Sequence, residues 1–355
     1  MTPYLSSGIK LKRGKKNKSS KRRGTTGTKS VKPDTAEPNS AECIPEKFLE
    51  RVTQVISDKF IAQALRSFQE PKDAAFRVNP LAQIDPAEVV KELSEQLVDL
   101  KPVEWFENAF SVGHDSRDKL VNSLAAENSQ IYIQNPSSFL PCLVLNPQPG
   151  EQVLDLCAAP GGKTLLLAAM MKNEGLVSAV EAVRGRYFKL QANLKRYGCE
   201  IARTYLSDGR SVGRKVPERF DRVLIDAPCS GETRIHQLNP ESFEFWSERK
   251  VKEQSRKQYG LIRSGFEALR PGGKLVYCTC SFAPEENEKV VSDFLIDQPK
   301  AELTEIEIPK GVDFEPGLTQ WNEKEMHAEV SKTVRIVPGR LMNGFFIAAI
   351  RKKVE

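Results

Sequence analysis

The feature that most constrains this fold is the alternation of short apolar runs with helical patterns beyond Pro136. The runs QVLDLC, GLVSAVEA, RFDRVLIDA and GKLVYCTC have the length and composition of buried strands. They are separated by KTLLLAAMMK, RYFKLQANLKRYG and SERKVKEQSRKQYGLIRSGFEALRPGG, which have helical spacing. This alternation predicts an α/β fold with a doubly wound, parallel sheet, whose ligands bind at the carboxyl ends of the strands. The closing run RLMNGFFIAAIRKK predicts one further strand.

The preceding segment predicts a small N-terminal α+β domain. Apolar residues recur at helical spacing from Phe48 to Phe68, and AAFRVNPL then reads as an extended segment. A second helix opens at Asp85-Pro86, and VEWFENAFSV resembles a strand. We therefore expect the small α+β domain at residues 41–111 and the sheet domain at residues 112–355.

The chain starts with a strongly basic segment. All eleven Lys and Arg residues up to Lys32 precede the first acidic residue, so removing them from the total charge of +6 leaves −5. The segment has almost no apolar residues to offset the entropy of ordering, which predicts a disordered tail over residues 1–40. Such a tail can neutralise the phosphates of a polyanion, but solubilising tails and organelle-targeting peptides have a similar composition.

Cysteine and histidine usage bears on metals and on the cellular compartment. The seven cysteines are scattered and lack the paired spacing of a disulfide framework or a zinc site, which favours a reducing, cytoplasmic setting. The three histidines lie far apart, so we expect no metal. No apolar stretch is long enough for a membrane span or a signal peptide, and we expect a soluble monomer.

A glycine-rich turn follows the first strand of the predicted sheet. It reads DLCAAPGGKT from Asp155 to Thr164, and its backbone N–H groups can approach a polar or anionic ligand closely. A Walker loop would need glycine at Cys157, and the dinucleotide motif GxGxxG is absent. The turn is predicted to bind another ligand, although a simple tight strand–helix connection could have the same composition.

Three acidic residues fall at the ends of successive predicted strands. Glu181 follows the second strand, Asp208 the third and Asp226 the fourth. An acid after the second strand is positioned to accept hydrogen bonds from ribose hydroxyls, so Glu181 takes that role. Asp208 precedes Gly209 in a turn signal, which is an alternative reason for its presence.

Two strand ends deliver cysteines to the same edge. The fourth strand ends in DAPCSG with Cys229, and the fifth in CTCSFAPEENE with Cys278 and Cys280. Cys278 lies among strand residues and is interpreted as an inert small apolar side chain. Cys229 and Cys280 lie beside turn residues, where a thiolate could be exposed and activated. No local charge pattern favours either as a nucleophile.

Together these motifs resemble the Sun/Nop (RsmB/NOP-type) family of RNA cytosine-carbon-5 methyltransferases. The resemblance runs from about Ala75 to the last strand, and its most specific pieces are IQNPSSFLPCLVLNPQPGEQVLDLCAAPGGKT, DAPCSG, LRPGGKLVYCTCSFAPEENE and RIVPG…NGFFIAAI. It implies a Rossmann-like class I methyltransferase sheet, S-adenosyl-L-methionine as methyl donor and RNA as partner. Ribosomal RNA is expected ahead of transfer RNA.

The resemblance also assigns roles to residues. Cys280 in TCS matches the nucleophile, Cys229 in PCS matches the cysteine that aids product release, and Asp226 is placed to hydrogen-bond the base. A thiolate added at carbon 6 makes carbon 5 of cytosine nucleophilic, which divides one difficult step into two. The residues that match S-adenosylmethionine contacts are Cys157, Ala158, Ala159, Pro160, Gly161, Gly162, Lys163, Glu181, Arg186, Asp208 and Asp226.

Alternatives and departures from the family pattern remain. Cys229 is an alternative nucleophile, because a cysteine after proline has that role in DNA cytosine methyltransferases. Gly339 stands where relatives often have histidine, and ETRIHQLNP after DAPCSG differs from the commoner glycine-rich continuation. With no recognisable RNA-binding module, target choice is expected to fall to the small domain and the tail. A nucleic-acid N-methyltransferase and a non-catalytic ribosome-assembly factor are the competing functions; DAPCSG argues against the first and the retained cysteines against the second.

Overall fold

A mixed sheet of nine strands organises residues 43–354, which are the residues described by the computed structural model. Five parallel strands follow the order β9-β8-β5-β6-β7, and β15, β14 and β11 extend the sheet beyond β9 in antiparallel pairs. β10 also pairs with β15. The bounds are β5 Gln152–Asp155, β6 Leu176–Glu181, β7 Ala202–Leu206, β8 Phe220–Asp226, β9 Leu269–Thr279, β10 Ala301–Leu303, β11 Phe314–Pro316, β14 Val334–Ile336 and β15 Phe345–Lys352.

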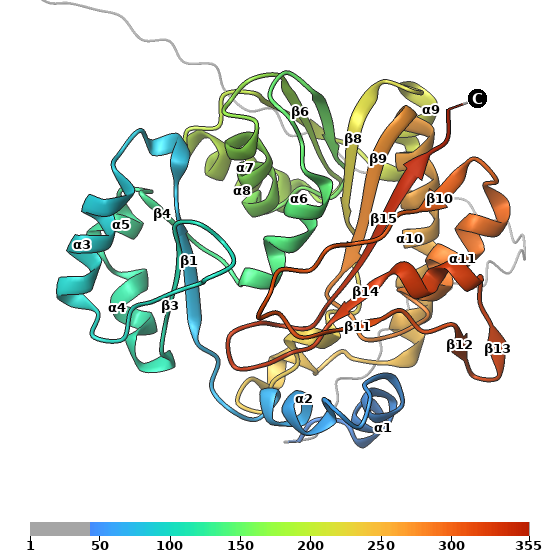
Figure 1. Ribbon diagram of the computed structural model, residues 1–355, viewed down its shortest axis with the longest axis horizontal. Coiled ribbons are helices and arrows are strands. Elements are labelled where there is room, and N and C mark those ends of the chain that lie inside the picture. The colour runs from blue at the N-terminus through green and yellow to red at the C-terminus, as the bar shows by residue number, and fades with distance from the viewer. Residues whose placement is uncertain (1–42, 355) are drawn as a thin grey trace, which may run out of the picture. The chain divides into compact units, whose positions relative to one another are not determined.

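Side chains that alternate along these strands fill two apolar layers. In β8, Val223 and Ile225 join one core cluster while Leu224 between them joins the other. The first cluster includes α10 (Glu248–Ala268) and α11 (Glu288–Asp297), and α9 (Val212–Lys215) contributes to it. Helices on the other side of the sheet are α6 (Leu140–Leu145), α7 (Gly162–Met170) and α8 (Arg184–Arg196) (Figure 1). The predicted doubly wound α/β fold is therefore confirmed.

A separate antiparallel sheet of four strands precedes the large one. Its order is β2-β3-β1-β4, with bounds β1 Ala74–Val78, β2 Lys101–Pro102, β3 Ala109–Val112 and β4 Ile131–Ile133. Its core includes side chains of α3 (Pro86–Gln96), α4 (Arg117–Val121) and α5 (Leu124–Glu127). Asp85 caps α3 as the sequence predicts, because its Oδ1 accepts the Ala87 N–H at 2.9 Å.

The small sheet does not coincide with the domain expected at residues 41–111. Strand β4 lies beyond residue 111 yet pairs with β1, so the expected boundary falls inside this sheet. A strand of three residues is too short to show the alternation of apolar and polar side chains by which a strand is recognised in sequence. The described residues also fall within one compact contact unit.

The first predicted helix is two helices, and they belong to a different core. α1 (Glu46–Val55) and α2 (Ile61–Ser67) share an apolar cluster with Phe282 and Trp246, which lie outside the small sheet. Helical periodicity shows that a segment has an apolar face, but it does not show which surface covers that face. α1 thereby supports the loop that follows Cys280.

Three short elements of the structure were not predicted from the sequence. α11 and the short pair β12 (Gln320–Trp321) with β13 (Lys324–Glu325) had no prediction. The basic tail falls outside the described residues. Within residues 43–354, no helix combines the length and apolarity required to cross a membrane, and no group of three or more His, Cys, Asp or Glu could hold a metal ion.

The aromatic cluster under α1 gives a stability prediction. The Phe48 ring is fully buried, with ring centroids 5.5 Å from Phe68 and 5.6 Å from Trp246. Replacing Phe48 with Ala should lower the free energy of unfolding by about 3–5 kcal/mol in urea denaturation, because it leaves a cavity in the core. Val98, which is 98% exposed, is the control. Val98→Ala should change the free energy of unfolding by less than about 0.5 kcal/mol. Equal effects of the two substitutions would contradict the packing described.

Candidate active site at the carboxyl edge of the sheet

The parallel strands bring most of the predicted site residues to one edge. A pocket of about 690 Å³ lies there and is lined from β4, the glycine-rich turn, the ends of β8 and β9, and the C-terminal segment. Glu181, Asp208 and Gly161 are predicted site residues that do not line it. The predicted residues that do are Cys157, Ala158, Ala159, Pro160, Gly162, Lys163, Arg186, Asp226, Cys229 and Cys280.

The small sheet packs directly on the glycine-rich turn. A Cβ atom at Gly162 would lie 2.8 Å from both Gln134 Nε2 and Tyr132 Cε1, so only glycine fits there. The fully buried Arg77 of β1 donates from Nη2 to the Gly162 carbonyl at 3.2 Å, and its guanidinium lies 5.2 Å from the centre of the Tyr132 ring. These contacts make β4 a wall of the pocket, and sequence reasoning missed them.

An ion pair fixes the predicted base-binding acid. Lys163 Nζ donates to Asp226 Oδ2 at 2.7 Å. Burial alone would lower the pKa of Lys163, but the charge of Asp226 raises it above its ordinary value. Lys163 therefore stays protonated and holds the Asp226 carboxylate at the pocket.

Asp155, at the end of β5, is a second buried acid on the pocket wall. Its Oδ2 accepts a hydrogen bond from Thr164 Oγ1 at 2.7 Å, while its Oδ1 has no partner among the described residues. Burial raises the pKa of Asp155 to about 6, although the bond from Thr164 opposes the shift. Asp155 is therefore a buried acid of the pocket wall that is held in place by Thr164.

Glu181 and Arg186 lie together beside the turn. The buried Glu181 carboxylate accepts the Val183 N–H at 2.8 Å, and its other oxygen is 3.6 Å from Arg186 Nη1. Arg186 in turn donates from Nη2 to the Ala159 carbonyl at 2.6 Å. Asp208 instead caps a short turn and pairs with Arg210, with 47% of its side chain exposed. The structure thus ties Glu181 to the turn and leaves Asp208 outside the pocket.

The two candidate cysteines meet across the pocket. Cys229 Sγ and Cys280 Sγ lie 3.1 Å apart, although they follow different strands. Cys278 is fully buried within β9, as predicted, and its Sγ donates to the Ile225 carbonyl at 3.6 Å. The structure therefore separates one buried cysteine from a pair in direct contact.

The surroundings of the pair make the two thiols unequal. The hydrogen bond with Cys229 and the nearby Arg234 guanidinium together lower the pKa of Cys280 to about 7, although burial opposes the shift. The pKa of Cys229 is raised well above its ordinary value by its bond to Cys280 and by burial, with a contribution from Glu286. The charges of Arg234 near Cys280 and of Glu286 near Cys229 therefore favour the negative charge on Cys280.

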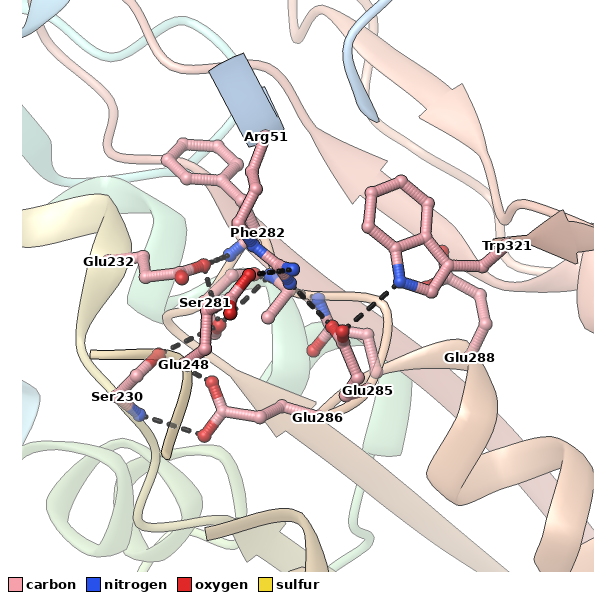
Figure 2. Close-up of polar contacts among 12 residues, drawn as sticks. Arg51, Ser230, Glu232, Glu248, Ser281, Phe282, Glu285, Glu286, Glu288 and Trp321 are labelled. Carbon is pink, nitrogen blue, oxygen red and sulfur yellow. Dashed lines mark hydrogen bonds and ion pairs between the residues drawn. The ribbon is translucent and has the colours of Figure 1, made fainter. Parts of the chain in front are cut away.

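A buried carboxylate holds the loop that carries Cys229. The side chain of Glu286 accepts the Ser230 N–H at 2.8 Å (Figure 2). It also accepts a hydrogen bond from Gln258 Nε2 at 3.1 Å. Gln258 Nε2 also donates to the Pro228 carbonyl at 2.9 Å. Both residues that flank Cys229 are thereby fixed. Burial raises the pKa of Glu286 to about 7.

A second buried carboxylate holds the loop that carries Cys280. Glu232 Oε2 accepts from Ser281 Oγ and from the Phe282 N–H, each at 3.0 Å (Figure 2). Its Oε1 accepts the Trp246 indole N–H at 2.9 Å. The APEENE run, which contains Glu286, belongs to the family resemblance. The partners of Glu286 and Glu232 lie in other segments and could not be inferred from the sequence.

Comparison with known proteins identifies the family. The family model described as 16S rRNA methyltransferase RsmB/F matches residues 142–351. A tRNA (cytosine(49)-C(5))-methyltransferase of Pyrococcus abyssi is 37% identical over 316 residues, which cover 87% of this chain and 96% of the relative. The ribosomal RNA small subunit methyltransferase F of Vibrio parahaemolyticus is 38% identical over 251 residues, 70% of this chain and 52% of the relative. The chain thus spans about half the length of that ribosomal RNA relative.

Solved structures agree with this assignment. A methyltransferase homologue from Pyrococcus horikoshii has a TM-score of 0.69 at 31% identity, covering 87% of this chain and all of the other. NSun6 from Pyrococcus horikoshii, solved with SFG, has a TM-score of 0.72 at 21% identity over 88% of this chain and all of the other, a similarity of fold. The chain therefore belongs to the RsmB/F family of RNA methyltransferases, S-adenosylmethionine-dependent enzymes that methylate carbon 5 of cytosine.

Proposed function

We propose that the protein methylates carbon 5 of a cytosine in RNA through a transient covalent bond between Cys280 and the base. The observation that carries this proposal is the contact of two thiols, 3.1 Å apart, on the wall of a pocket that also contains Asp226 and the glycine-rich turn. The target base must be unstacked or single-stranded to enter such a pocket.

The residues around the turn fit S-adenosylmethionine. The backbone of the turn lines the pocket and offers polar partners, and Glu181 beside the turn suits ribose hydroxyls. When bound, S-adenosylmethionine supplies an electrophilic methyl group. Cys157 to Lys163, Glu181, Arg186 and Asp226 are proposed to hold it, and Asp208 would first have to leave Arg210.

The two cysteines are proposed to act in sequence. The Cys280 thiolate bonds to carbon 6 of the cytosine, and carbon 5 then takes the methyl group. Ring nitrogen 3 takes up a proton from solvent as the thiolate adds, and the Asp226 carboxylate accepts a hydrogen bond from that N–H, so negative charge does not build up on the ring. To finish, carbon 5 loses its proton and the bond from carbon 6 to Cys280 breaks.

Cys229 is suited to the release step. While Cys280 is a thiolate, its charge and hydrogen bond keep Cys229 protonated. Once the Cys280 sulfur is bonded to carbon, that charge is gone and the pKa of Cys229 falls. Cys229 can then ionise and accept the carbon 5 proton. Cys229 as the nucleophile is the alternative that mutagenesis decides.

The RNA class is the finer part of the proposal. Ribosomal RNA is proposed ahead of transfer RNA. The description of the matching family model as a 16S rRNA methyltransferase supports this order. Transfer RNA is a second candidate, favoured by the match to 96% of a transfer RNA methyltransferase. The small sheet and the basic tail are proposed to contribute to target choice, because β4 lines the pocket and the tail can neutralise phosphates.

Substitution of the two cysteines tests the covalent mechanism. Cys280→Ala should abolish methylation and form no adduct, because no thiolate reaches carbon 6. Cys229→Ala should accumulate a protein–RNA band that survives denaturing electrophoresis and carries labelled methyl. Cys43→Ala, at an exposed cysteine outside the pocket, should keep wild-type turnover. A trapped band with Cys280→Ala in place of Cys229→Ala would reverse the roles, and normal turnover in both would reject the covalent route.

Calorimetry tests the cofactor assignment. Replacing Glu181 with Ala should weaken S-adenosylmethionine binding by about 1–3 kcal/mol, because ribose hydroxyls lose a buried acceptor. Glu253→Ala removes an acid of α10 whose side chain is 60% exposed, and should leave the affinity unchanged. Wild-type affinity in folded Glu181→Ala protein would reject the ribose role.

Bisulfite sequencing identifies the target. Total RNA from cells with and without the gene should differ at a cytosine in ribosomal RNA if the first expectation holds. A difference confined to transfer RNA would establish the second candidate. Absence of any gene-dependent site in RNA, combined with activity of the purified protein on DNA, would reject RNA as the substrate.

A further inference from the structure

We propose that the positive charge of Arg234 stabilises the thiolate of Cys280 before the thiolate attacks the base. The inference rests on the proposed function, because it takes Cys280 as the nucleophile. Arg234 lies in the segment ETRIHQLNP, which departs from the commoner family pattern and to which the sequence analysis gave no role.

The backbone around Arg234 is fastened to the end of strand β9. Arg234 ends a 3-10 turn, Glu232–Arg234, that follows Gly231, whose φ of 80° is in the left-handed region. Thr233 donates to the Cys280 carbonyl from both its N–H and its Oγ1, each at 3.2 Å. Because Glu232 also binds Ser281 and Phe282, the turn and the Cys280 loop form one hydrogen-bonded unit. Arg234 is therefore held at a defined place beside Cys280.

The side chain of Arg234 points into the pocket. It lines the same cavity as Cys229 and Cys280, although the residue stays open to solvent. The negative charge of Cys280 is the largest of the effects that raise the pKa of Arg234. The shared cavity and the opposite charges therefore both point to Cys280 as the group on which this guanidinium acts.

Other charged groups near Cys280 offset one another. Facing it are Cys229, Asp226, Lys163 and Arg234. Lys163 is bonded to Asp226 at 2.7 Å, so much of its charge is neutralised. Among residues 43–354, no carboxylate forms an ion pair with Arg234. Arg234 is thus the cation whose charge remains available to the thiolate.

The chemistry of an arginine suits this task. Its guanidinium stays protonated at any pH where the enzyme works, so it cannot take the thiol proton and acts only by its charge and N–H donors. The Cys280 proton passes to solvent, and the sulfur electron pair then forms the bond to carbon 6. Formation of that bond removes the negative charge, so the interaction favours the state before attack.

The test measures the reactivity of the Cys280 thiol in the free, full-length protein. Alkylation of Cys280 by iodoacetamide is followed against pH, with peptide mass spectrometry to resolve it from the other cysteines. In Arg234→Met the midpoint should move to higher pH by about one unit, with a roughly tenfold slower reaction near neutral pH. Arg234→Lys keeps a positive charge and should restore part of the shift. The pH profile of kcat for methylation should move in the same direction.

A second arginine, far from the pocket, provides the control. Arg219→Met changes an arginine at the opposite, amino end of β8 and should leave both profiles unchanged. Thermal unfolding of each variant shows that the fold is kept. An unshifted Cys280 midpoint in folded Arg234→Met and Arg234→Lys overturns the inference, as does a change confined to KM for RNA, which would make Arg234 an RNA contact. Methylation by Cys280→Ala would instead reject the proposed function, whatever the alkylation shows.

Discussion

The parallel pairing of β8 with β9 is the constraint on which the site depends. Its register sets Asp226 opposite Cys278, so both strands end at the same level of the sheet. The chain then needs only three residues to reach Cys229 and two to reach Cys280. Because parallel strands deliver their carboxyl ends to one edge, two cysteines 51 positions apart come within 3.1 Å of each other.

Buried carboxylates turn this proximity into a defined geometry. Glu232, Glu286 and Glu288 are each 2% exposed or less, and a buried carboxylate is tolerated only when donors surround it. Glu286 binds the loop after β8, Glu232 binds the loop after β9, and Glu288 pairs with the buried Arg335. Arg335 Nη1 also donates to the Phe282 carbonyl at 2.9 Å. The loops that carry Cys229 and Cys280 are therefore held in place by hydrogen bonds to buried carboxylates.

The N-terminal segments complete the site from two directions. α1 and α2 cover Phe282 and so support the Cys280 loop, while β4 closes the pocket next to the glycine-rich turn. The buried Arg77 links the small sheet to that turn through the Gly162 carbonyl. A shift of the small sheet would therefore move the turn that is proposed to bind the methyl donor. The region proposed to choose the RNA is thus in contact with the proposed cofactor site.

The sequence by itself determined the α/β fold, the common edge of the strand ends and the burial of Cys278. Each of these follows from local periodicity and strand order, and the family resemblance added the roles of the motif residues. Only the tertiary structure decided which core α1 and α2 join, that β4 belongs to the small sheet, and that Asp208 lies off the pocket. It also gives Cys280 and Cys229 different charged neighbours, which no local charge pattern in the sequence revealed. The reason is physical: thiol ionisation depends on charges and hydrogen bonds through space, and Arg234 and Glu286 reach these sulfurs from segments that sequence spacing cannot place.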